Sequence, residues 1–125
     1  MNATASADEP PTLRGEHREL LDQLLDKWSL HVLDRLCEHG ALRFNELRRA
    51  IPTITQKSLT ATLRRLERNG MVERILLSDR PVAVEYRIAP MGKGLQDLID
   101  ALLLWTTAHL PDVERAREHY DAARD

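Results

Sequence analysis

The residues most able to do chemistry lie in one short basic segment, residues 55–70. Leu59, Leu63 and Leu66 recur there at i, i+4 and i+7, so they share one face of a predicted helix and must be buried. The opposite face presents cations and hydroxyls, which can contact a phosphate backbone and base edges. The members of that face are Lys57, Ala61, Arg64 and Arg68, flanked by Ser58, Thr60 and Arg65.

Positive charge is concentrated around this segment. The net charge of −2 over 125 residues, taken alone, argues against a nucleic-acid partner. However, residues 41–75 carry 8 basic and 3 acidic side chains, whereas residues 1–40 carry 4 and 8, and residues 76–125 carry 6 and 9. Binding responds to a local patch more than to a total. The distribution therefore favours a DNA-facing surface over a merely solvated helix face.

Other reactive residue types form no recognisable active site. The single cysteine, Cys37, excludes an intramolecular disulfide, a cysteine-based zinc cluster and a CxxC redox pair, and we expect it to be a buried structural thiol. The 5 histidines lack the paired spacing that zinc requires, and no glycine-rich phosphate loop is present. We therefore expect no enzyme, no metal and no cofactor.

The length and composition indicate one domain with tails. Residues 1–12 are small, acidic and proline-containing, which predicts a disordered arm and no secretion signal. No apolar run reaches the roughly 20 residues of a membrane helix, so we expect a cytoplasmic protein without a membrane partner. Residues 13–110 form the predicted DNA-binding domain with its terminal dimerisation helices, and residues 111–125 a C-terminal helical tail.

The elements that must position the basic face follow from local signals. Gly40 reads as the glycine after a helix, Pro52 ends the next one, and Thr55 is a natural N-cap for the basic helix. A short helix, a break of three to four residues and a longer basic helix have helix-turn-helix spacing. The predicted helices are 16–27, 28–39, 44–51 and 55–68, and 41–43 is a predicted edge strand.

A hairpin is predicted directly after the basic helix, from strands at 71–77 and 83–88. Val84, Tyr86 and Ile88 alternate with charged residues, as a half-buried strand requires. The connecting turn places Arg80 at an exposed tip, which suits a narrow and negative minor groove. An ordinary hairpin with a solvated arginine remains the alternative.

The terminal helices carry more apolar surface than one small domain can cover. The final helix, predicted from Pro90 to Leu110, has an unusually wide apolar arc, and the first helix shows the same excess. A two-fold homodimer would cover both surfaces and would present two reading helices to two half-sites. The predicted dimer contacts are Leu20, Leu21, Leu24, Leu98, Leu102 and Trp105.

Several motifs occur in order over roughly residues 20 to 110. They are Lys27–Ser29, Leu42–Leu47, Ile54–Thr60, Leu63–Glu67, Gly70–Arg74, and Val84–Ile88 followed by Gly92. Together they resemble the HxlR-type winged-helix transcriptional regulators, a MarR-like group. The resemblance implies a mainly α fold with a small antiparallel hairpin, a winged helix-turn-helix. It also implies a dimeric bacterial DNA-binding regulator that pairs through its terminal helices and often acts near its own promoter.

The chain departs from this family pattern at two places. Members that sense oxidants carry a cysteine about a dozen residues before the Lys-Trp pair, but residues 13–25 contain none. Ala89 stands where relatives tend to have a threonine. We therefore expect a signal through the helical layer, where Trp28, His31 and Trp105 could frame a pocket for a small apolar effector. The alternative is that both tryptophans fill the core.

The predicted function is a sequence-specific, effector-responsive DNA-binding regulator, a repressor, that acts as a homodimer on double-stranded DNA. Two alternatives stay open, a winged-helix protein that acts through protein contacts and a small-molecule-binding protein without a DNA-binding role. The residues predicted to contact DNA are Arg43, Asn45, Thr55, Gln56, Lys57, Ser58, Thr60, Ala61, Arg64, Arg65 and Arg80.

Overall fold

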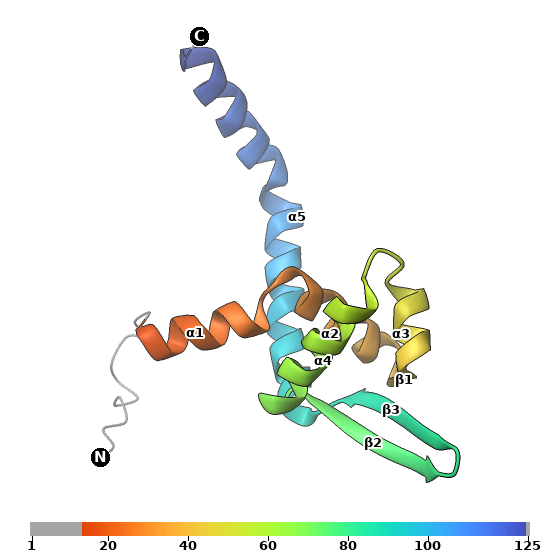
Figure 1. Cartoon of the computed structure of the whole chain (residues 1–125). Coiled ribbons are helices and arrows are strands. Elements are labelled where there is room, and N and C mark those ends of the chain that lie inside the picture. The colour runs from red at the N-terminus through yellow and green to blue at the C-terminus, as the bar shows by residue number, and fades with distance from the viewer. Residues whose placement is uncertain (1–13, 125) are drawn as a thin grey trace, which may run out of the picture.

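The computed structural model describes residues 14–124, in five helices and three strands (Figure 1). The arm predicted over residues 1–12 lies outside the described residues. The mainly helical winged fold with a small antiparallel sheet is confirmed. In chain order the elements are α1 (Gly15–Leu24), α2 (Lys27–His39), β1 (Ala41–Arg43), α3 (Phe44–Ala50), α4 (Gln56–Arg68), β2 (Val72–Asp79), β3 (Val82–Ile88) and α5 (Pro90–Arg124).

The sheet has three antiparallel strands in the order β1-β3-β2. Tyr86 in the central strand lies opposite Leu42 of β1 and Arg74 of β2, and the β2–β3 register shifts between Leu76 and Ser78. The predicted edge strand is therefore present, and it joins the hairpin to the start of α3. In Figure 1 the hairpin extends away from the helical body, as a wing must if it is to reach DNA.

Helix α2 is the centre of the core and packs against α1, α3, α4, α5 and the sheet. Val32, Leu33 and Leu36 on α2 are completely buried. Leu59 and Leu66 on α4 are also completely buried. Burying such a side chain contributes about 1.5–3 kcal/mol relative to leaving it exposed. The apolar face of α4 is therefore fixed on the protein, and its other face is left to solvent.

The joint between α1 and α2 differs from the predicted one. Helix α1 ends at Leu24 and α2 begins at Lys27, whereas the sequence predicted a first helix to residue 27. The reason is Asp26, whose extended backbone breaks the helix and whose carboxylate accepts a hydrogen bond from the Ser29 amide at 2.8 Å. At the other end of α2, Gly40 has a positive φ of 84°, which confirms the predicted C-terminal glycine.

Helix α5 is one continuous helix and does not end at Leu110. Pro111 lies inside it, and the helix changes direction in its C-terminal half (Figure 1). A proline removes one helical hydrogen bond and commonly bends a helix. Because the side chains around Pro111 are exposed, water can hydrate the carbonyl that loses its partner.

Gly92 allows the first turn of α5 to contact the segment before β2. A Cβ atom on Gly92 would lie 2.2 Å from the Met71 carbonyl oxygen. The same oxygen accepts a hydrogen bond from the Ala89 amide at 2.9 Å. The backbones of α5 and of the β2 entrance therefore meet too closely for any side chain at position 92.

Two predicted burial states are wrong. Leu24 was expected to contact a dimer partner, but it is only 6% exposed and belongs to the core of its own chain. The reason is that α1 packs against α2 and α4. Cys37 was expected to be a buried thiol, but it is exposed, since it lies in the last turn of α2 beside the exposed Glu38 and His39.

Candidate nucleic-acid interface

Helix α4 has the two faces that the sequence predicted. The Thr55 hydroxyl oxygen accepts a hydrogen bond from the Ser58 amide at 3.0 Å, which confirms Thr55 as the N-cap. Ser58 and Thr60 are half-buried beside this cap. Five residues of α4 that the sequence predicted on the DNA-facing side are exposed. They are Gln56, Lys57, Ala61, Arg64 and Arg68.

A polar recess of about 410 Å³ lies between α4 and the sheet. Gln56, Thr60 and Arg64 line it from successive turns of α4, at a spacing of four residues. Arg74 and Tyr86 line it from the strands. Two arginines therefore converge on one recess, with Glu67 as the acidic residue in its lining. Arg74 was not predicted, and β2 offered no signal for it, because exposed and buried residues do not alternate along that strand.

A second recess, of about 720 Å³, lies between α3 and the returning strand of the wing. Arg43 and Asn45 line it, and the Glu46 carboxylate accepts a hydrogen bond from the Arg43 amide at 2.7 Å. Arg49 also lines it and was not predicted. Arg49 follows Asn45 by four residues, so the two share one face of α3, and this spacing was the available signal.

The wing ends in a tight turn with Arg80 at its exposed tip. Its backbone N–H donates to the Ser78 hydroxyl oxygen at 3.3 Å. Within residues 14–124, none of the cations that face this side of the molecule takes part in an ion pair, and their charge is therefore available to a phosphate backbone. These cations are Arg43, Arg49, Lys57, Arg64, Arg68, Arg74 and Arg80.

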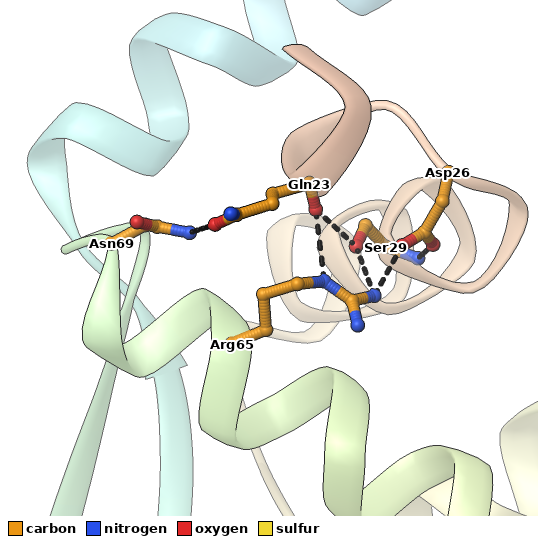
Figure 2. Close-up of polar contacts among 5 residues, drawn as sticks. All are labelled: Gln23, Asp26, Ser29, Arg65 and Asn69. Carbon is orange, nitrogen blue, oxygen red and sulfur yellow. Dashed lines mark hydrogen bonds and ion pairs between the residues drawn. The ribbon is translucent and has the colours of Figure 1, made fainter. Parts of the chain in front are cut away.

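Arg65 does not join this surface (Figure 2). Its guanidinium forms an ion pair with Asp26, and its Nε donates to the Gln23 carbonyl oxygen at 3.0 Å. It also donates to the Ser29 hydroxyl at 3.2 Å, and Asn69 donates to the Gln23 side-chain oxygen at 2.9 Å. Arg65, which the sequence predicted to contact DNA, thus makes its polar contacts within the protein.

These contacts join α4 to the corner between α1 and α2. The Gln23 carbonyl belongs to the last turn of α1, where backbone oxygens lack helical partners, and Asp26 is the N-cap of α2. Arg65 satisfies both groups at once from the last turn of α4 (Figure 2). The orientation of the exposed basic face is therefore set relative to both N-terminal helices.

The three residues expected to frame an effector pocket do not line one cavity. Trp105 is 54% exposed and stacks on His109 of its own helix, with ring centroids 4.5 Å apart. Trp28 packs against the core, and its ring lies 5.8 Å from that of His31. A pocket of about 440 Å³ does lie between α2 and α5, but of the three residues only His31 lines it.

Among the residues that the structure describes, no cluster of histidine, cysteine or carboxylate side chains could hold a metal ion. In the same part of the chain, no helix has the length and apolar character needed to cross a membrane.

Comparison with known proteins identifies the family of the chain. A family model for the HxlR-like helix-turn-helix matches residues 23–114. The HTH-type transcriptional regulator YtcD of Bacillus subtilis strain 168 is 39% identical over 90 residues, which are 72% of this chain and 71% of that protein. The HTH-type transcriptional regulator YtfH of Escherichia coli K12 is 35% identical over 101 residues, covering 81% and 79%.

A solved structure agrees with this assignment. A regulator of the MarR family from Enterococcus faecalis V583 superimposes with a TM-score of 0.72 at 33% identity, over 87% of this chain and 99% of that one. The family and these relatives are transcriptional regulators and not enzymes. The chain belongs to the HxlR family and is a DNA-binding helix-turn-helix transcriptional regulator.

Proposed function

We propose that the chain is a homodimeric repressor that acts in the cytoplasm and binds an operator with two copies of α4. The observation that carries this proposal is a group of exposed cations around α4 that, among residues 14–124, take part in no ion pair. The N-terminal turn of α4 also exposes Gln56 and Lys57. Both side chains can donate hydrogen bonds to base edges in the major groove. A dimer bound across a promoter would exclude polymerase, which is why we propose repression.

The other surface residues receive phosphate and minor-groove roles. Arg64 and Arg74 would contact one backbone segment from the recess beside α4. Arg43 and Arg49 would contact another from the recess beside the wing, together with Asn45. Arg80 at the wing tip would enter the minor groove, which A·T-rich sequences narrow. Thr55, Ser58, Thr60 and Ala61 would shape the approach of α4 to the groove, since they are at or near its N-terminal turns.

Exposed apolar surface on the terminal helices supports the dimer. Leu20 and Leu21 on α1, and Leu98, Leu102 and Trp105 on α5, are all at least two-fifths exposed. Both helices project from the body in Figure 1. Apolar patches of this kind on a small protein mark an interaction surface, and a two-fold axis is the simplest way to cover them.

The experiment is a gel shift with the DNA fragment that the protein selects from its own genome. We expect affinity to fall steeply with salt. In a plot of the logarithm of the binding constant against the logarithm of the salt concentration, the slope (the salt slope) should steepen by about 0.9 for each phosphate contacted. Arg115→Ala is a matched control, because Arg115 lies far along α5 and pairs with Asp112, so its removal should leave the slope unchanged. Binding that ignores salt, or that is absent at low salt, would contradict the proposal.

A further inference from the structure

We propose that the pocket between α2 and α5 binds a neutral, mostly apolar small molecule with one N–H or O–H donor. This inference rests on the proposed function in treating that molecule as the regulator's effector. The pocket volume of about 440 Å³ lies within the range of small-ligand sites. Its lining residues are Lys27, Leu30, His31, Asp34, Gln96, Ile99 and Leu103.

Gln96 supplies the polar recognition group. Its side chain is only 1% exposed, and its Nε2 donates to the Asp100 carboxylate at 3.0 Å. Its Oε1 is the buried side-chain oxygen that has no hydrogen-bond partner in the described chain. A buried acceptor left without a partner costs stability, and buried polar groups are satisfied in most proteins. A ligand that donates one hydrogen bond would meet this unsatisfied acceptor.

The rest of the pocket favours a neutral ligand with an apolar body. Leu30, Ile99 and Leu103 form its apolar wall. The charges at its edge already have partners within the chain. The Asp34 carboxylate pairs with Arg35 at 2.7 Å, and the Lys27 ammonium lies 4.5 Å from the centre of the Trp28 ring. An ionised ligand is therefore not required to balance a charge.

The pocket is connected to the reading helix through α2. Lys27 lines the pocket and directly follows Asp26, whose carboxylate holds Arg65 of α4 (Figure 2). Helix α2 also packs against both α4 and α5. A ligand that separates α2 from α5 would move the Asp26 contact and change the orientation of α4. Such a ligand shifts DNA affinity only if it binds one orientation better than the other.

The first test compares two probes of nearly equal shape on the full chain without DNA. Indole carries one N–H donor, and benzofuran replaces that group with an oxygen that cannot donate. By calorimetric titration we expect indole to bind at least about fivefold more tightly, as one hydrogen bond to a buried acceptor implies. In Gln96→Met, which keeps the side-chain length but removes the acceptor, this preference should disappear.

A second pair of variants locates the binding site independently of Gln96. Leu103→Trp should fill the pocket and abolish indole binding. Leu104→Trp is the matched control, because Leu104 is 72% exposed and is not among the lining residues, so binding should persist. Both substituted positions are exposed, which keeps the test valid if Gln96→Met does not fold.

Two results would overturn the proposal. The first is equal affinity for indole and benzofuran, and the second is no binding of either probe. If neither probe binds and Gln96→Met weakens the dimer in sedimentation experiments, a second copy of the chain supplies the donor instead of a small molecule. DNA plays no part in these titrations. A protein that selects indole but binds no operator would therefore refute the proposed function and leave the ligand site intact.

Discussion

At the scale of single residues, the adjacent arginines 64 and 65 show how one position along a helix separates two roles. Their side chains point about 100° apart, so Arg64 lines the recess beside the sheet while Arg65 faces the α1–α2 corner. The sequence predicted the exposed face that carries Arg64. It could not assign Arg65, because Asp26 and Gln23 lie about 40 residues away and only the tertiary fold brings them together.

Substituting these two arginines should therefore give different phenotypes. Arg64→Met should weaken binding to all DNA sequences alike and reduce the salt slope by about 0.9, because one phosphate contact is lost. Arg65→Met should leave the slope unchanged but lower the free energy of unfolding by about 1–3 kcal/mol, since Asp26 and the Gln23 carbonyl lose their partner. Urea denaturation and salt-dependent gel shifts on both variants measure these effects, and a reduced slope for Arg65→Met would contradict the separation of roles.

At the scale of elements, the sequence predicted the parts with local signals and missed those set by distant contacts. Thr55 and Gly40 mark helix ends by their own chemistry, and strand alternation marks β3. The continuous α5 was not predicted, because whether a helix tolerates Pro111 depends on its surroundings. Gln96 was missed for a related reason. Gln96 shares a face of α5 with Gly92 and Ile99, which the sequence shows. The sequence does not show that the Gln96 Oε1 atom is buried without a hydrogen-bond partner, because that depends on the residues packed around it.

The wing provides a prediction at this scale. Arg80→Ala should lower operator affinity modestly, and most on sites with A·T-rich flanks, where the minor groove is narrow and negative. Gel shifts on operators that differ only in their flanks measure the effect, with Arg115→Ala as the arginine control outside the interface. An equal affinity of wild type and Arg80→Ala on every flank would show that the wing does not touch DNA.

The close contact between α5 and the residue before β2 provides a second prediction at the scale of elements. Gly92→Ala should lower the free energy of unfolding by about 1–3 kcal/mol, because the new Cβ would lie 2.2 Å from the Met71 carbonyl oxygen and the backbones must separate. Gly94→Ala is the control on the same helix, since a Cβ there meets nothing within 4 Å. It should be neutral or stabilise by up to about 1 kcal/mol. A stable Gly92→Ala protein would contradict the close approach.

At the scale of the whole molecule, the surplus of leucines on α1 and α5 was visible in the sequence, but its division between core and surface was not. Leu24 packs inside its own chain, while Leu20 and Leu21 one turn earlier remain exposed. An apolar stripe predicts that a neighbour exists, without saying whether that neighbour belongs to the same chain. Both helices project from the body (Figure 1), and several of their leucines are exposed to solvent.

The dimer can be tested by a pair of identical substitutions on α5. Leu102 is 56% exposed and Leu104 is 72% exposed, and the two side chains point about 200° apart on the helix. Leu102→Glu should leave the fold intact, since exposed substitutions usually change stability by less than about 0.5 kcal/mol. It should nevertheless dissociate the dimer in sedimentation experiments, because a carboxylate would be buried in an apolar interface.

Operator affinity should fall when the dimer dissociates, since a monomer offers one reading helix to two half-sites. The control variant, Leu104→Glu, should remain a dimer. A monomeric Leu104→Glu beside a dimeric Leu102→Glu would place the interface on the opposite face of α5 from the one proposed.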